Sequence, residues 1–197
     1  MSRVEIYKIN KDRRLKWVGD ANNAWLGCMH IWRSLEEKYL PSFGQKPWAK
    51  TEEEKKEYYS RTYRMGDKDA YQEIWNLYKD PRLNWNDRIC MMSTLDNMYI
   101  EYKDIPEVAD AYETVEFSND NMKKQAEIMR QIYEEGKDGS VIGIFKNENS
   151  VCSIYDFCDC DPDDNGILFM RDSWDSVMEE LRILRDNNYV ENEEDGD

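Results

Sequence analysis

The residues best suited to chemistry form one segment in the last quarter of the chain, Asp161-Pro162-Asp163-Asp164-Asn165-Gly166. Oxygen donors at its first, third and fifth positions and glycine at its sixth match the opening of a calcium-binding loop. Aspartate stands at the twelfth position, where such loops usually have glutamate. The ligands of such a site would be Asp161, Asp163, Asn165 and Asp172. The alternative is a tight turn between two strands, which the proline, aspartates and Asn-Gly pair favour.

The same region concentrates negative charge. Its five aspartates are Asp156, Asp159, Asp161, Asp163 and Asp164. If their carboxylates converged on a pocket, they would suit a two-metal site for phosphoryl transfer. If they point outward, they form either a solvated loop or a contact surface for lysine and arginine of a partner, and a solvated loop is the commoner outcome.

Other catalytic patterns are weak or missing from the sequence. Cys158 and Cys160 are separated by one residue, whereas zinc knuckles separate their thiols by two to four. His30 is the only histidine, and it lies among apolar residues of a predicted helix. The sequence has no nucleophile elbow, P-loop or dinucleotide-binding glycine pattern. We therefore expect no cofactor and no enzymatic activity, although a carboxylate-only site of the glycosidase kind stays open.

Two tryptophans are candidates for partner contacts. Trp48 lies in a loop containing Gly44 and Pro47, and Trp85 follows Asn84 at a predicted helix start. Neither position fits an obvious core periodicity, and tryptophan is a common anchor of protein interfaces. The alternative for Trp85 is packing within the first turn of its own helix.

Composition narrows the functional classes. The 197 residues include 42 acids and 27 bases, for a net charge of −15. This charge disfavours direct binding to nucleic acid or to anionic membranes and favours a basic partner. No signal peptide or transmembrane run is predicted, and the five cysteines are interpreted as reduced thiols, which together predict a cytoplasmic protein.

The elements that position these residues can be predicted from periodicity and capping. Strand-like stretches at 4–9 and 15–18 predict an N-terminal hairpin. Apolar residues that recur every three or four positions after capping residues predict helices. These helices span about 23–40, 51–63, 70–78, 85–95, 105–115 and 119–135.

Beyond Gly136 the apolar period changes to that of strands, at 141–145, 151–155 and 167–170. A last helix is predicted from Trp174, capped by Asp172 or Ser173. The predicted fold class is α+β, mostly helical with about six helices, an N-terminal β-hairpin and a C-terminal three-stranded antiparallel meander followed by a helix. We expect a single domain over 1–197, in which 1–117 and 118–197 are possible lobes.

Two stretches carry a family resemblance. One is Met1-Ser2-Arg3-Val4-Glu5-Ile6-Tyr7-Lys8 with Asn23-Ala24-Trp25-Leu26-Gly27 and Ile31-Trp32. The other joins Asp80-Pro81-Arg82-Leu83, Ile89-Cys90 and Ser93-Thr94-Leu95-Asp96-Asn97 to Asp104-Ile105-Pro106. Together they resemble a family of uncharacterised phage and mobile-element proteins over about the first two-thirds of the chain. The resemblance implies a bacterial cytoplasm as the setting and a role in blocking a host defence protein, and it carries no catalytic residues.

These features predict a non-enzymatic acidic binding protein. The leading hypothesis is a phage-type inhibitor of a basic, nucleic-acid-handling host protein, in the manner of anti-CRISPR or anti-restriction proteins. One alternative is an immunity or antitoxin-like protein that neutralises a basic toxin. Another is a calcium- or metal-dependent protein that uses the loop from Asp161 to Asp172. Interspersed bases such as Lys55-Lys56 and Lys123-Lys124 argue against complete mimicry of duplex DNA.

Overall fold

The computed structural model confirms the α+β class. It describes residues 3–22, 28–40, 51, 76–94, 98–147, 157–161, 166–171 and 174–188. Its main element is a four-stranded antiparallel sheet with the strand order β2-β1-β4-β3. The strands are β1 (Val4–Asn10), β2 (Leu15–Ala21), β3 (Met98–Glu101) and β4 (Val141–Asn147). A separate antiparallel pair consists of β5 (Cys158–Asp161) and β6 (Ile167–Met170).

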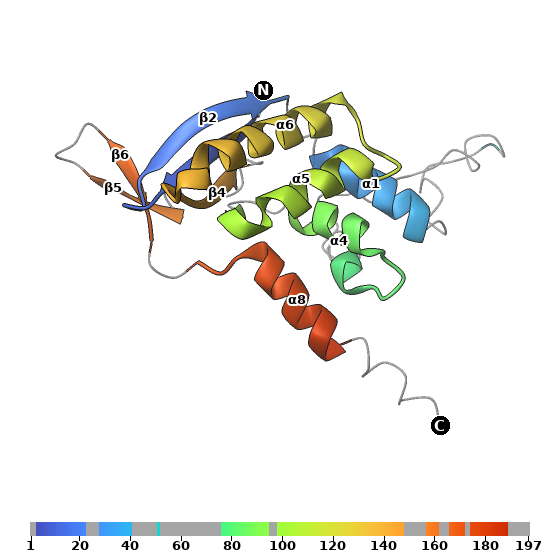
Figure 1. The fold of residues 1–197 in the computed structure, drawn as a ribbon. Helices are drawn as coiled ribbons and strands as arrows, with labels where there is room; N and C mark the ends of the chain where they lie inside the picture. Colours follow the sequence, from blue (N-terminus) through green and yellow to red (C-terminus); the bar gives the residue numbers. More distant parts are fainter. Residues whose placement is uncertain are drawn as a thin grey trace.

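Helices cover one face of the main sheet. Helix α6 (Asp120–Glu135) lies along the sheet and contacts β1, β2 and β4, and α5 (Ile105–Thr114) packs beside α6 (Figure 1). Helix α4 (Trp85–Met92) packs against α5, and both α1 (Cys28–Tyr39) and α8 (Val177–Asn188) contact α4. Short 3₁₀ turns, η2 (Asn76–Lys79), η3 (Tyr102–Asp104) and η4 (Gly136–Asp138), precede or follow these elements.

The sheet separates two apolar clusters, because successive side chains of a strand point to opposite faces. On β4, Ile144 belongs to the large cluster formed with the helices, whereas its neighbour Phe145 belongs to a smaller cluster. In the smaller cluster the rings of Phe145 and Phe157 stack with centroids 4.1 Å apart. The β5–β6 pair therefore packs over part of the sheet face that the helices leave open.

Local capping signals are confirmed at the starts of α4 and α6, whereas Asp104, which precedes α5, makes no capping hydrogen bond with its side chain. The side chain of Asn84 accepts a hydrogen bond from the backbone N–H of Asp87 at the start of α4. Asn119 accepts likewise from the N–H of Met122 at the start of α6, and Gly136 ends that helix. These bonds satisfy N–H groups that have no partner inside the helix, which explains why such caps can be predicted from sequence.

The predicted helix over 85–95 is too long, and a strand was missed. Helix α4 ends at Met92, and β3 follows at Met98–Glu101. The four residues of β3 have no alternating pattern, since three of them are buried. Their strand conformation depends on pairing with β4, about 45 residues further along the chain. That long-range pairing overrides local propensity.

The predicted C-terminal three-stranded meander is wrong. Strand β4 pairs with β1 and β3 inside the main sheet, and β6 pairs with β5 instead. The segment 159–161, predicted as loop, belongs to β5 because its backbone bonds to the apolar strand β6. The predicted strand 151–155 lies outside the described residues.

Differences remain at the other predicted helices. The last helix begins at Val177 rather than Trp174, since its first backbone bonds run from Glu179 and Glu180 to the carbonyl of Ser176. Trp174 instead packs on Phe157, with ring centroids 5.1 Å apart. Both of its predicted caps, Asp172 and Ser173, lie outside the described residues, as does nearly all of 51–75. Only the end of the predicted helix 70–78 is described, and it forms the 3₁₀ turn η2.

Candidate functional site

Helix α5 carries a regular series of acids, here called the α5 acidic row. Its members stand three positions apart: Asp104, Glu107, Asp110, Glu113 and Glu116. Glu107, Asp110 and Glu113 lie within the helix and span about 9 Å of its axis at 1.5 Å per residue, whereas Asp104 is the N-cap and Glu116 follows the extended C-cap residue. The side chain of Asp104 is buried, whereas that of Glu116 at the other end is 86% exposed. The C-terminal end of the row therefore faces solvent.

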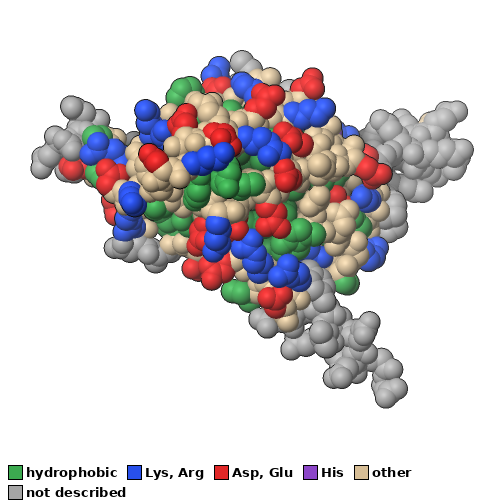
Figure 2. All heavy atoms as spheres, in the orientation of Figure 1, with side chains coloured by type: hydrophobic (Ala, Val, Ile, Leu, Met, Phe, Trp, Pro, Cys, Tyr) green, Lys and Arg blue, Asp and Glu red, His purple; other side chains and the backbone are tan. Residues whose placement is uncertain are grey.

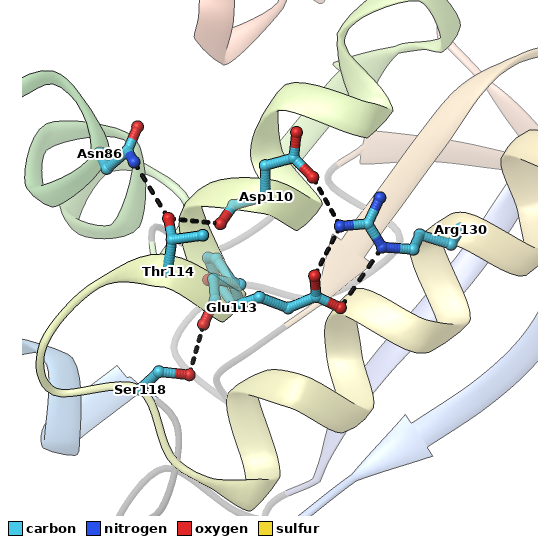
Figure 3. Close-up of polar contacts among 7 residues, drawn as sticks. Asn86, Asp110, Glu113, Thr114, Ser118 and Arg130 are labelled. Carbon is cyan, nitrogen blue, oxygen red and sulfur yellow. Dashed lines mark hydrogen bonds and ion pairs between the residues drawn. The ribbon is translucent and has the colours of Figure 1, made fainter.

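Arginines from two other helices bridge neighbouring members of the row. Arg182 of α8 forms a fork with Asp104, with nitrogen–oxygen distances of 2.7 and 3.1 Å, and reaches Glu107 at 3.0 Å. Arg130 of α6 contacts Asp110 at 2.5 Å and Glu113 at 2.6 Å (Figure 3). Hydrogen bonds to Glu113 and then Asp110 raise the pKa of Arg130. These bridges attach α6 and α8 to α5.

The third cation of the row is Lys38 at the end of α1. Its ammonium lies 3.0 Å from the buried carboxylate of Asp87 and 3.4 Å from that of Glu116. Asp87 also accepts from the hydroxyl of Tyr39 at 2.5 Å and from the amide of Asn84 at 3.0 Å. Because Asp87 is almost inaccessible to water, these donors replace its hydration.

A polar pocket of about 620 Å³ opens where the ends of α1, α4 and α5 meet. We call it the α4–α5 pocket, and it is lined by Lys38, Asn84, Trp85, Asn86, Asp87, Thr114, Val115 and Glu116. In its wall the amide of Asn86 donates to Thr114 Oγ1 at 3.1 Å, and Thr114 donates to the carbonyl of Asp110 (Figure 3). The pocket thus adjoins the exposed end of the α5 acidic row.

Two of the pocket's titratable side chains have raised pKa values. The hydrogen bond to Asp87 raises the pKa of Lys38, and burial followed by the same carboxylate raises that of Tyr39. Both side chains are therefore protonated at neutral pH and act as hydrogen-bond donors rather than as bases or nucleophiles. Among the residues that the structure describes, no group of three or more acidic, histidine or cysteine side chains is placed to hold a metal ion.

Trp85 lines this pocket but also takes part in the packing of the helices. Its indole N–H donates to Glu107 at 2.7 Å, and the guanidinium of Arg185 lies 5.0 Å from its ring centroid. The side chain is half-buried and packs against the main core. The packing interpretation applies in part, because the side chain contacts α5 and α8, and the interpretation of Trp85 as a partner contact stays a prediction.

Only part of the predicted aspartate-rich site is described. Asp159 on β5 is 71% exposed and lies 3.1 Å from Arg171, and Asp161 pairs with Ile167 at the end of the same strand. The register leaves 162–166 to connect two antiparallel strands, and Gly166 has a φ of +77°. Outside the described residues lie Trp48, Asp156, Asp163, Asp164, Asn165 and Asp172.

The described cysteines and His30 show no arrangement typical of a catalytic site. All four described cysteines are free thiols, and burial raises the pKa of Cys158 to about 12. A thiol with so high a pKa is a poor nucleophile and metal ligand at neutral pH. His30 Nε2 lies 2.6 Å from the carbonyl oxygen of Phe117, so its ring ties α1 to the turn between α5 and α6.

The α5 acidic row and the α4–α5 pocket were missed by sequence reasoning. A usable signal was present, because five acids at a constant spacing of three cover a predicted helix. The apolar residues of α5, including Val108 and Tyr112, identify the buried side of that helix. They do not indicate what the acids on its other side contact. The bridging cations come from three distant helices, and their positions depend on tertiary structure.

Comparison of the chain with protein families, with curated proteins and with solved structures finds no match. Within the described residues, no helix combines the length and apolar character that crossing a bilayer requires.

Proposed function

We propose that this chain is a non-enzymatic binding protein whose acidic surface engages a basic protein partner. The observation that carries the proposal is the exposed end of the α5 acidic row beside the α4–α5 pocket. There Glu116 projects into solvent, and Lys38, which lies near it, is shared with the buried carboxylate of Asp87. An incoming lysine or arginine would find an incompletely neutralised carboxylate at the rim of a polar pocket.

Charge distribution supports a local contact rather than complete mimicry of DNA. On the face drawn in Figure 2, acidic and basic side chains alternate, and no broad area of one sign is visible. Each cation of the α5 acidic row is shared between two carboxylates, so the row keeps a net negative charge. Such a surface steers a basic partner at low salt without reproducing a continuous line of phosphates.

The finer proposal concerns the partner. Proteins that handle nucleic acids build positively charged grooves, because duplex DNA carries one negative charge per about 1.7 Å of axis. A net charge of −15 and the phage-type resemblance favour a host defence protein of this kind, acting in the bacterial cytoplasm. The protein would then act as a steric inhibitor of the anti-CRISPR or anti-restriction type, rather than as an enzyme.

The test is capture of partners from a nuclease-treated bacterial lysate at about 0.1 M and about 0.5 M salt, since added salt screens exposed charges. The bait proteins are the unaltered chain and a double variant, Asp110→Asn with Glu116→Gln. A matched control, Glu127→Gln with Glu179→Gln, removes two exposed acids elsewhere. We expect the unaltered chain and the control to capture a basic nucleic-acid-handling protein at the lower salt and to lose it at the higher salt. The double variant alone should capture this protein weakly.

One outcome would contradict the proposed contact surface, and another would contradict the finer proposal about the partner. If the double variant and its control captured the partner equally well, the α5 acidic row would not be the contact surface. Capture of a basic toxin that does not handle nucleic acid would instead support the immunity or antitoxin alternative. Association rates of the purified pair provide a second measurement, because loss of steering charges slows association more than it speeds dissociation.

A further inference from the structure

The buried carboxylate of Asp87 receives its described side-chain donors on one oxygen only. Lys38, Tyr39 and Asn84 each donate to Oδ2. Within the described part of the chain no donor reaches Oδ1, although the side chain is 1% exposed. A buried carboxylate oxygen normally accepts hydrogen bonds, because burial removes the water that would otherwise bind it. Asp87 lines the α4–α5 pocket, so Oδ1 is the acceptor that this side chain offers to a ligand there.

Two further acceptors border the same pocket. The amide nitrogen of Asn86 donates to Thr114, and Figure 3 shows the carbonyl oxygen of Asn86 on the side of the amide away from that bond. The carboxylate of Glu116 is exposed and lies 3.4 Å from the ammonium of Lys38. The side chains of the pocket that carry N–H groups already donate to acceptors, and they are Lys38, Asn84, Trp85 and Asn86. A ligand that brings its own donors therefore fits this pocket.

The charges around the pocket favour a cation. Asp87 and Glu116 carry two negative charges and Lys38 carries one positive charge, so one negative charge is left over. The pocket lies at the C-terminal end of α5, where the helix dipole also favours a cation. The positive end of α4 borders it too, but Asp87 stands in the first turn of that helix and offsets this end. A ligand with a single positive charge would neutralise the pocket.

The lining of the pocket favours an arginine side chain over a lysine. Trp85 and Val115 provide apolar surface on which the methylene groups of a long side chain can pack. A guanidinium presents several N–H donors in a planar fork, whereas an ammonium is a compact point charge. Acceptors from the start of α4 and from beyond the end of α5 suit the fork. The pocket volume of about 620 Å³ lies within the range typical of small-ligand sites.

We propose that the α4–α5 pocket takes an arginine side chain of the basic partner. Its N–H groups donate to Oδ1 of Asp87, to the carbonyl oxygen of Asn86 and to the carboxylate of Glu116. Lys38 keeps its place, because it donates to the other oxygen of Asp87. This inference rests on the proposed function, since it names the group of the partner that enters the pocket beside the α5 acidic row.

The test is titration of the intact protein with two blocked tripeptides, acetyl-Gly-Arg-Gly-amide and acetyl-Gly-Lys-Gly-amide, at constant ionic strength. The two peptides carry equal charge, so unspecific attraction to the acidic chain is the same for both. Binding is followed by the NMR signal of the Trp85 indole N–H, which Trp85→Phe assigns. The double variant is Asn86→Ala with Glu116→Gln. Its control is Glu127→Gln with Glu179→Gln, two exposed acids that do not line the pocket, and urea unfolding verifies that each variant keeps its fold.

We expect the arginine peptide to shift the Trp85 signal with a millimolar Kd. The double variant should raise this Kd about tenfold, because hydrogen bonds to a charged group are lost, and the control should leave it within about twofold. The lysine peptide should bind about fivefold or more weakly. No shift of the Trp85 signal, or an unchanged Kd in the double variant, would overturn the proposal. Equal affinity for the lysine peptide would refute the choice of arginine.

Failure of this inference is distinguishable from failure of the proposed function. If the arginine peptide does not bind, while capture from the lysate depends on Asp110 and Glu116, the inference about the pocket fails alone. If the peptide binds as expected, while the variant Asp110→Asn with Glu116→Gln captures the partner normally, the proposed contact surface fails and the pocket stays an arginine site.

Discussion

The ammonium of Lys146 lies 4.6 Å from the ring centroid of Tyr112 and donates a hydrogen bond to its phenol oxygen, although both side chains are fully buried. The same ammonium donates at 2.7 Å to the carbonyl of Ser93, which is the C-cap of α4. A cation at this place complements the negative end of the helix dipole. Strand β4 is thereby joined to α4 and α5 through polar contacts inside an apolar core.

Tyr112→Phe should lower the free energy of unfolding by about 1–3 kcal/mol, because a buried donor loses its acceptor. The hydroxyl of Ser93, 2.8 Å from the phenol oxygen, loses a partner as well. Urea denaturation measures the loss, and Tyr102→Phe is the matched control, since its half-buried hydroxyl donates to a neutral carbonyl. An equal or smaller loss for Tyr112→Phe than for Tyr102→Phe would contradict this account of the buried pair.

Trp32→Ala should destabilise the fold by about 3–5 kcal/mol, the usual range for removing a large core aromatic. Trp32 is buried on α1 and its indole N–H donates to Thr94. Trp17→Ala removes the same side chain from an exposed position and should change the stability by no more than about 0.5 kcal/mol. Chemical denaturation of the two variants makes the comparison, and similar losses would refute the assignment of Trp32 to the core.

Stability should fall at alkaline pH through Lys38 and Tyr39. Both pKa values are raised in the folded protein, so the folded state binds more protons than the unfolded chain above about pH 10. Their contribution is fully present below the ordinary pKa values and is lost as pH rises through the raised ones. Unfolding free energies between pH 7 and 11.5 should therefore decline less steeply for Lys38→Met with Tyr39→Phe, and an unchanged slope would exclude this linkage.

Calcium should leave the melting temperature unchanged at millimolar concentration. The described segments on either side, 158–161 and 167–170, are strands, whereas a calcium loop of this type lies between two helices. A ligand that binds only the folded state would raise Tm by mass action. A calcium-dependent rise that Asp161→Ala abolishes would restore the metal interpretation.

The features that were predicted best from the sequence are those that depend on residues close together in the chain. Asn84 and Asn119 cap helices because their side chains bond to backbone groups three positions on, and this geometry needs no tertiary contact. The β1–β2 hairpin was predictable for the same reason, since its strands are separated by a short polar turn. The α+β class follows from these local signals together.

The remaining features depend on contacts that are distant in sequence. β3 becomes a strand because β4 pairs with it, and β4 lies between β1 and β3 rather than in a meander. The α5 acidic row had a visible spacing, but its cations, Lys38, Arg130 and Arg182, come from three other helices, two of them more than 60 residues away in the chain. Periodicity identifies the face of a helix, and it does not identify what lies opposite that face.

The position of β4 also sets the order in which the protein can fold during synthesis. β1 is complete at residue 10, yet its second neighbour in the sheet ends at residue 147. At about 5–20 residues per second, the ribosome delivers β4 roughly 7–30 s after β1. Throughout this interval one edge of the hairpin is without its native strand, so nascent chains shorter than about 147 residues should be the species that chaperones hold and that aggregate when chaperones are scarce.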